Sequence, residues 1–213
     1  MAQSDDRRPL SSRDTGWARA IARRLSATGI TPNQISMASM AMAAGAGAAF
    51  WLAGTAASGP RIVLLLAAAL FCQFRLLCNL FDGMVAIEGG KQAADGPFWN
   101  EFPDRVADIL ILAGVGYGIG APALGWAAAA FAVLTAYTRE LGRNCGLPAD
   151  FSGPMAKQHR MATITAAALL SLLEPIWRGH NDVLTTALWL IAMGAAVTAL
   201  RRAANIVRGL RAR

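Results

Sequence analysis

Long apolar stretches recur along this chain, and they limit its possible folds more than any other feature. The hydrocarbon core of a bilayer is about 30 Å thick, so a helix needs about 20 apolar residues to cross it. Six stretches approach or meet that length, at roughly 35–57, 61–86, 98–119, 122–142, 160–174 and 183–204. A hydrophobic content of 55% also separates the chain from ordinary soluble domains. We therefore predict an all-α, polytopic membrane protein with six transmembrane helices.

The basic residues alternate with these six stretches instead of covering one soluble face. The net charge is +7, and most basic residues fall in segments that six crossings place on one side. These residues are Arg7, Arg8, Arg13, Arg19, Arg23, Arg24, Lys91, Arg139, Arg143, Lys157, Arg160, Arg201, Arg202, Arg208, Arg211 and Arg213. The opposite loops hold only Arg61 and Arg178. The positive-inside rule therefore predicts cytoplasmic termini in a bacterial inner membrane, with membrane lipids and not nucleic acid as partners.

The chain divides into four predicted segments. They are a mobile polar N-terminus (1–14), an interfacial amphipathic helix (15–30), a six-helix membrane domain (31–205) and a basic C-terminal tail (206–213). The interfacial helix is predicted because Trp17, Ile21 and Leu25 recur every four positions, with arginines between them. A disordered basic tail is the alternative for that segment. The sequence TPNQIS at 31–36 has the residues of a helix cap followed by proline, and it predicts the start of the first span.

Polar residues inside membrane spans are costly, and here they concentrate at the ends of two neighbouring spans. In the second span, Arg75, Asn79 and Asp82 are spaced four and three residues apart, so they share one helical face. The short loop at 87–96 makes the next span an antiparallel neighbour. We therefore expect this polar face to meet the start of the third span near the cytoplasmic surface.

The third span begins with a second polar face. Asn100, Asp104 and Asp108 recur every four residues and lie on the same side of the helix. Carboxylates and amides that converge in a low-dielectric site need a cation to balance them. Oxygen ligands of this kind select a hard ion, so the sequence predicts Mg²⁺ or Mn²⁺, with Ca²⁺ as a further option. A purely structural polar network between the two helices is the alternative.

The two polar faces carry a specific spacing. It reads Asn79-x-x-Asp82-Gly83-x-x-Ala86, then, after nine residues, Gly96-x-x-x-Asn100-x-x-x-Asp104. This pattern resembles the signature of the CDP-alcohol phosphatidyltransferase family, D-x-x-D-G-x-x-A-R followed eight residues later by G-x-x-x-D-x-x-x-D. Together with the six spans, the resemblance covers most of residues 17–205.

The chain departs from the family pattern at three positions. Asn79 and Asn100 stand where the family has its first and third aspartates, and Ile87 replaces the usual arginine. The pattern is most similar to a bacterial YnbA-type branch. Because each asparagine removes a negative charge, either metal binding weakens or Glu101 or Glu88 compensates.

The resemblance implies transfer of a substituted phosphate, with phosphatidyl from CDP-diacylglycerol as the expected group, to an alcohol acceptor with release of CMP. It also implies a role for each matching residue. Asp104 would be the general base, and the metal ligands would be Asp82, Asn79, Asn100, Asp104 and Glu101. The nucleotide-binding residues would be Gly83, Ala86, Gly96 and Arg75. A homodimer is a further expectation of the resemblance.

The connection between the fourth and fifth spans is rich in basic residues. Arg139, Arg143, Lys157 and Arg160 could bind the phosphate of the acceptor, because guanidinium groups grip two phosphate oxygens each. Positive-inside bias alone would also place them there.

Two other functions remain as alternatives. The first is a non-catalytic relative that binds lipid or nucleotide, in which the asparagines have removed catalysis. The second is a small transporter, which should have polar residues near the bilayer midplane in two repeats. The polar residues lie at one end of the spans instead, which argues against transport.

Overall fold

The computed structural model describes residues 15–213, and this part of the chain is helical without any strand. The elements are α1 (Gly16–Ser26), α2 (Pro32–Ala53), α3 (Ser58–Glu88), α4 (Gly96–Gly118), α5 (Pro122–Asn144), α6 (Lys157–Leu170), the 3₁₀ helix η2 (Ser171–Trp177) and α7 (Asp182–Arg211). The predicted mobile segment 1–14 lies outside the described residues. The all-α prediction is confirmed for the described part.

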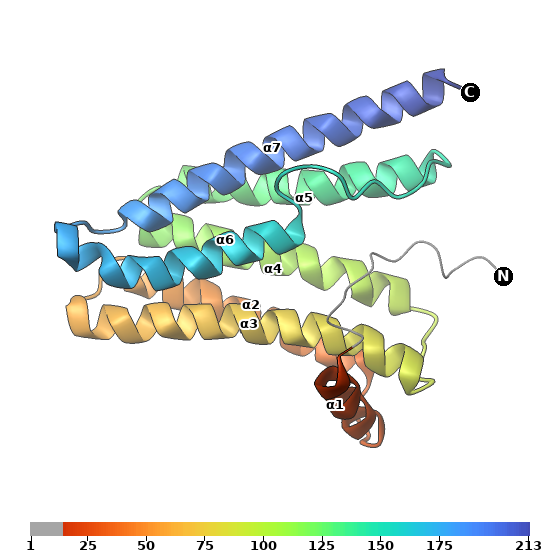
Figure 1. Cartoon of the computed structure of the whole chain (residues 1–213), viewed down its shortest axis with the longest axis horizontal. Coiled ribbons are helices and arrows are strands. Elements are labelled where there is room, and N and C mark those ends of the chain that lie inside the picture. Colours follow the sequence, from red (N-terminus) through yellow and green to blue (C-terminus); the bar gives the residue numbers. More distant parts are fainter. Residues whose placement is uncertain (1–14) are drawn as a thin grey trace.

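Helices α2 to α7 run along one common direction and reverse at each connection (Figure 1). The C-terminal ends of α3, α5 and α7 therefore gather at the same end of the bundle as the N-terminal ends of α2 and α4 (Figure 1). We call this the motif end, because it contains Asn79–Glu88 of α3 and Gly96–Asp104 of α4. The opposite end contains the α2–α3 turn and residues 171–182. Helix α6 is shorter, and its N-terminus lies nearer the middle of the bundle (Figure 1).

The start of α2 follows from its local sequence. The Thr31 hydroxyl accepts a hydrogen bond from Gln34 N at 3.2 Å, and Gln34 Oε1 accepts one from Thr31 N at 3.0 Å. This reciprocal capping box satisfies two of the backbone N–H groups that a helix start leaves unpaired. Pro32 occupies the first turn, where it needs no donor. The helix start predicted from this segment is therefore confirmed.

Helices α2 and α4 cross at glycines. A Cβ on Gly114 of α4 would lie 2.3 Å from Gly47 O, and one on Gly47 would lie 2.3 Å from Leu110 O. Only a residue without a side chain permits such close contact between backbones. The crossing therefore fixes α4, which carries Asp104, against α2.

Within residues 15–213, three helices are long and apolar enough to cross a membrane, namely Pro32–Ala53, Ser58–Glu88 and Asp182–Arg211. Large apolar side chains on the outside of the bundle are exposed, including Val63, Met193 and Leu200. Such a surface fits lipid better than water. Crossing by α4, α5 and α6 stays a prediction. Helix α7 also continues through most of the predicted basic tail.

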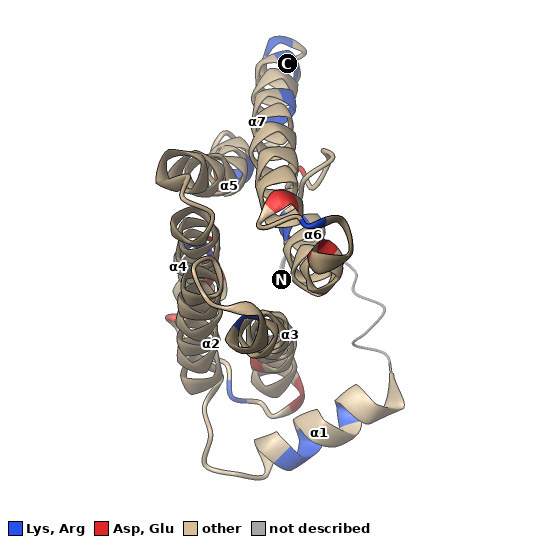
Figure 2. Ribbon diagram, turned by 90° about the vertical axis from the view of Figure 1, so that its left-hand side faces the viewer, with Lys and Arg blue, Asp and Glu red and all other residues tan. Residues whose placement is uncertain are grey.

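Helix α1 lies to one side of the bundle of α2 to α7, beside α3 at the lower edge of that bundle in Figure 1, and runs crosswise to the other helices (Figure 2). Its Ala18 and Ala22 are fully buried and pack in one cluster with Phe81 and Val85 of α3. The Trp17 ring lies edge-on to Phe81, with centroids 6.3 Å apart. A helix therefore exists within the predicted segment 15–30, while its placement on a membrane surface stays a prediction.

Candidate active site

The polar face of α3 points into the bundle at the motif end. Arg75 is completely buried and Asp82 nearly so, while Asn79 is half-buried. Asp82 is held from two sides. The Ser36 hydroxyl of α2 donates to Asp82 Oδ2 at 2.8 Å, and Gly83 N donates to Oδ1 at 2.6 Å. Because Arg75, Asn79 and Asp82 are four and three residues apart, they lie on the same face of α3, as predicted, and that face is turned toward the interior.

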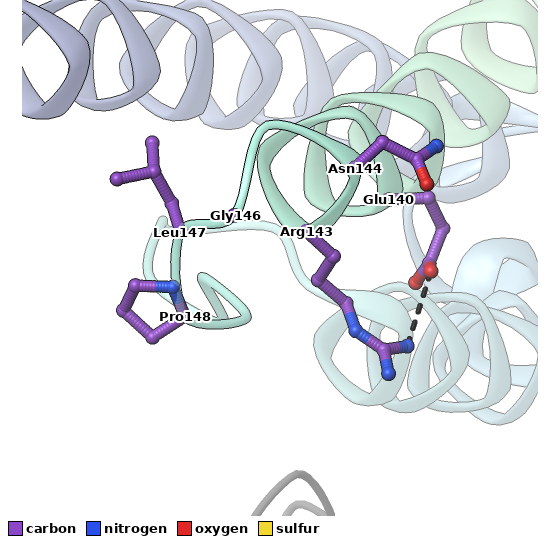
Figure 3. A pocket seen from close by; sticks show the side chains of 6 residues that line it. All are labelled: Glu140, Arg143, Asn144, Gly146, Leu147 and Pro148. Atoms are coloured by element: carbon purple, nitrogen blue, oxygen red, sulfur yellow. Dashed lines mark hydrogen bonds and ion pairs between the residues drawn. The ribbon is translucent and has the colours of Figure 1, made fainter.

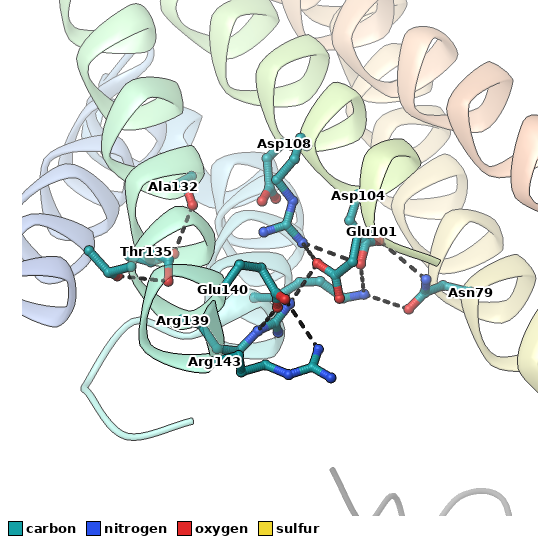
Figure 4. Close-up of polar contacts among 12 residues, drawn as sticks. Asn79, Glu101, Asp104, Asp108, Ala132, Thr135, Arg139, Glu140 and Arg143 are labelled. Atoms are coloured by element: carbon teal, nitrogen blue, oxygen red, sulfur yellow. Dashed lines mark hydrogen bonds and ion pairs between the residues drawn. The ribbon is translucent and has the colours of Figure 1, made fainter. Parts of the chain in front are cut away.

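Asp104 of α4 is the centre of the site. Its Oδ1 accepts hydrogen bonds from Arg75 Nη2 at 2.7 Å and from Asn79 Nδ2 at 3.2 Å. Its Oδ2 accepts one from Lys157 Nζ, which also donates to Asn79 Oδ1 at 2.6 Å. Figure 4 shows the Asn79 side chain turned toward Asp104. We call these four residues the Asp104 cluster; they come from α3, α4 and α6.

A chain of ion pairs extends from the Asp104 cluster to α5 (Figure 4). Arg105 lies 3.6 Å from Asp104 Oδ2 and 3.4 Å from Glu101 Oε2. Arg139 Nη2 donates to the same Glu101 oxygen at 2.6 Å, and Arg139 Nε donates to Glu140 at 2.9 Å. Two predicted residues, Glu101 and Arg139, are therefore partners of each other in this arrangement.

Asp108 and Arg160 form a separate, deeper pair. Arg160 Nη2 donates to Asp108 Oδ2 at 2.5 Å, and both side chains are almost completely buried. Arg160 Nη1 donates to Met155 O at 3.0 Å. In the described part of the chain, Asp108 Oδ1 and Arg160 Nε have no hydrogen-bond partner. Because Arg160 is buried and paired, it is not available to an acceptor phosphate in this arrangement.

The remaining predicted residues lie around the Asp104 cluster without joining it. Asn100 is exposed, and within residues 15–213 no hydrogen bond of its side chain to the cluster is seen. Gly83 and Ala86 are half-buried on α3, and Gly96 begins α4. The sequence pattern thus brings together Asp82, Asn79 and Asp104, and leaves Asn100 at the surface.

A pocket of about 660 Å³ lies at the end of α5 and in the loop that follows (Figure 3). It is lined by Glu140, Arg143, Asn144, Gly146, Leu147 and Pro148. Arg143 donates to Glu140 at 3.1 Å and is the only predicted phosphate-binding residue among the lining residues. The pocket therefore lies beside the ion-pair chain and not over Asp104.

The donor set does not fit a divalent cation in this arrangement. The described residues contain no group of three or more His, Cys, Asp or Glu side chains placed to hold a metal ion. Two motif positions are amides, and both oxygens of Asp104 already accept from cationic side chains. The ligand set of Asp82, Asn79, Asn100, Asp104 and Glu101 thus stays a prediction.

Sequence reasoning missed two partners in the site. Ser36 holds Asp82, but its only signal was its place in the TPNQIS segment. Arg105 neighbours Asp104 in sequence and joins it to Glu101. Lys157 was predicted to bind acceptor phosphate, and its pairing with Asp104 could not be read from the sequence, because it depends on where α6 begins.

No family model matches the chain. Among curated proteins, it is 29% identical over 138 residues to a phosphatidylinositol phosphate synthase of Streptomyces avermitilis, covering 61% of this chain and 57% of that protein. It is 34% identical over 152 residues to a bifunctional IPC transferase and DIPP synthase of Rubrobacter xylanophilus, covering 67% of this chain and 32% of that protein. The matches thus span less than two thirds of either relative.

Solved structures of Mycobacterium tuberculosis phosphatidylinositol phosphate synthase share the fold. The structure with CDP-DAG bound has a TM-score of 0.72 at 19% identity, covering 89% of this chain and 92% of that one. The structure in complex with manganese and citrate has a TM-score of 0.73 at 19% identity, covering 89% and 88%. These comparisons support the CDP-alcohol phosphatidyltransferase family; the YnbA-type branch stays a prediction.

Proposed function

We propose that this chain is an integral membrane CDP-alcohol phosphotransferase of phospholipid biosynthesis. The observation that carries the proposal is the meeting of the two motif helices at one end of the bundle, where Asp82 and Asp104 lie among the cations Arg75 and Lys157. The motif spacing and the names of both curated relatives support the same activity. The CDP-DAG in the structure of a protein with this fold supports a CDP-linked lipid as substrate.

The reaction is a displacement at phosphorus. The acceptor hydroxyl oxygen forms a bond to the phosphorus that carries the lipid alcohol, and the bond from that phosphorus to the oxygen bridging to CMP breaks. CMP leaves with the electron pair, a phosphodiester forms, and the hydroxyl proton passes to a carboxylate. We assign that carboxylate to Asp104, which lies one helical turn from the motif position Asn100.

The surrounding residues supply binding. Arg75 and Lys157 lie where positive charge can meet the diphosphate. Gly83, Ala86 and Gly96 would contact the nucleotide, because they stand at the matching positions of the motif. The acceptor phosphate would lie toward Arg143 and Arg139, at the α5 pocket. The manganese in a structure of the same fold supports Mg²⁺ or Mn²⁺ as cofactor, whereas the donor set of this chain argues against it.

The proposal places the chain in a bacterial inner membrane with six spans and with both termini and the motif end in the cytoplasm. The distribution of basic residues supports this orientation. Helix α1 would lie on the membrane surface, and two copies would form the functional unit.

A non-catalytic relative that binds lipid or nucleotide is the second candidate. It is favoured by one observation, namely that Asp104 is already hydrogen-bonded on both oxygens. A base of this kind must lose a partner before it can take a proton.

The test is CMP release by the purified chain in lipid micelles, with CDP-diacylglycerol and a panel of alcohols that includes phosphorylated polyols. Parallel reactions contain Mg²⁺, Mn²⁺ or EDTA. Acceptor-dependent CMP release supports the proposed activity, and its loss in Asp82→Asn would tie it to this site. Nucleotide binding without release under every condition would support the non-catalytic relative.

A further inference from the structure

The charge around Asp104 is the opposite of what a divalent cation requires. Three cationic side chains lie within 4 Å of this one carboxylate. The Arg75 nitrogen is 2.7 Å away, the Arg105 nitrogen is 3.6 Å away, and Lys157 Nζ is hydrogen-bonded to it. Unit charges at such distances interact strongly, because little solvent lies between them to screen the interaction. A divalent ion entering next to Asp104 would therefore meet three cations, and the other acidic motif residue, Asp82, already accepts from the Ser36 hydroxyl and from Gly83 N.

Lys157 occupies the position between two motif residues. Its Nζ donates to Asn79 Oδ1 at 2.6 Å and to Asp104 Oδ2. These two residues stand at the first and fourth acidic positions of the family pattern. An ammonium has three N–H donors, and the described residues accept two of them. One donor remains for a further acceptor, such as a phosphate oxygen.

Asn79 is matched to a lysine and not to a metal. Its amide oxygen accepts from Lys157 while its amide nitrogen donates to Asp104 at 3.2 Å. An aspartate at this position would lose the donation and place two carboxylates side by side. The amide therefore suits a site whose positive charge comes from a side chain.

Arg75 provides an independent sign that an anion belongs here. Its side chain is completely buried, yet its Nε and Nη1 have no hydrogen-bond partner among residues 15–213. Buried guanidinium donors without partners are costly, and they mark a place where a ligand can satisfy them.

We propose that Lys157 takes the place of a divalent cation in this site: its ammonium, held by Asn79 and Asp104, binds the diphosphate of a nucleoside diphosphate ester together with Arg75. The ester as ligand follows from the proposed function. The contacts with Asn79 and Asp104 hold the ammonium before the ligand binds. When the ammonium then turns to the phosphates, its contact with Asp104 Oδ2 is lost, and this oxygen is free for the acceptor proton.

The first experiment is a Mn²⁺ titration of the full chain in detergent, followed by the electron paramagnetic resonance signal of free Mn²⁺. We expect no binding by the unaltered protein below about 1 mM, the weak limit of oxygen-ligand sites. The double variant Asn79→Asp/Lys157→Ala, which restores a carboxylate and removes the ammonium, should gain Mn²⁺ binding. Micromolar binding by the unaltered protein would overturn the proposal, whatever the variants do.

The second experiment is CDP binding by calorimetry in EDTA. Lys157→Met should weaken binding by at least about tenfold, as expected for losing a hydrogen bond to a charged group, and Lys157→Arg should retain most of it. Lys91→Met, at the other lysine of the chain, is the matched control and should change nothing. Unchanged affinity in a folded Lys157→Met variant would overturn the proposal.

The two experiments separate this inference from the proposed function. Neither experiment requires turnover. A chain that releases no CMP, does not bind Mn²⁺ and binds CDP through Lys157 would contradict the transferase proposal and support the inference. Acceptor-dependent CMP release that EDTA abolishes would keep the transferase and overturn the role of Lys157.

Discussion

Helix α3 carries two buried arginines, one in its first turn and one near its middle, and the two differ in how completely the protein satisfies them. At the opposite end, Arg61 donates to Glu174 at 2.6 Å, to Asn181 at 2.7 Å and to Ala53 O at 2.9 Å. One turn before the motif residue Asn79, Arg75 has a hydrogen bond only to Asp104 among the described residues, and two of its nitrogens have no partner among them.

The carboxylates differ in the same way. Glu174 also accepts from Asn181 N at 3.0 Å and from Val183 N at 2.8 Å, and so joins η2 to the start of α7. Asp104 instead accepts from three side chains on two neighbouring helices and from none of the backbone N–H groups. We call the Arg61–Glu174 pair saturated, because its polar atoms are hydrogen-bonded, and such a pair stabilises the fold. The Arg75–Asp104 pair is unsaturated, because Arg75 has unbonded donors that a ligand can accept from.

The largest effect should come from breaking the saturated pair. Glu174→Ala leaves Arg61 buried and uncompensated, so the free energy of unfolding should fall by about 3–5 kcal/mol. Thermal unfolding in detergent measures this change. The paired change Glu174→Leu/Arg61→Met is the control and should recover much of the loss. A Glu174→Ala variant as stable as the parent would show that the two clusters do not differ in this respect.

Breaking the unsaturated cluster should affect rate more than binding. Asp104→Asn should lower acceptor-dependent CMP release by at least about 10²-fold, the lower end for loss of a general base. CDP binding should persist, because Arg75 and Lys157 are then released to the phosphates. Calorimetry and CMP release on one preparation measure both. If nucleotide binding disappears with the rate, Asp104 organises the binding site and is not the base.

Much of this comparison is invisible in the sequence. The spacing of Arg75, Asn79 and Asp82 predicted their shared face, since helical periodicity and a short connection determine it. Arg61 and Glu174 lie 113 residues apart, and no local pattern links them. Lys157 reaches Asp104 only because α6 begins deep in the bundle after a long loop (Figure 1).

Ser36 offers a finer test of the motif end. Ser36→Ala removes the hydroxyl that donates to the buried Asp82 carboxylate at 2.8 Å, which should cost about 1–3 kcal/mol. We expect the loss in stability and in CDP affinity together, measured by thermal unfolding and calorimetry. Ser39, also buried but without a hydrogen-bond partner for its hydroxyl, supplies the control: Ser39→Ala should leave both nearly unchanged.

The ion-pair chain toward α5 should matter least. Glu101 is about one-third exposed where it meets Arg139 and Arg105, and exposed pairs contribute about 0.2–1 kcal/mol. Glu101→Gln should therefore shift thermal stability only slightly and leave Mn²⁺ binding absent. If Glu101→Gln instead abolished a measurable Mn²⁺ affinity that Glu88→Gln retained, Glu101 would compensate for Asn100 as the sequence suggested.

The glycine crossing of α2 and α4 has a mechanical consequence for catalysis. Gly47 and Gly114 meet backbone to backbone, so no side chain there can repack to let the two helices slide. Asp104 lies ten residues before Gly114, roughly 15 Å along the helix at 1.5 Å per residue. The close crossing therefore fixes its position relative to α2. The first turn of α6 is tied to the helix that carries Asp104, because Arg160 donates to the buried Asp108 carboxylate of α4 at 2.5 Å. Both the aspartate and the start of the lysine-bearing helix are thus anchored on α4, so a ligand at the Asp104 cluster would be accommodated by turning the Lys157 side chain and not by sliding one helix past another.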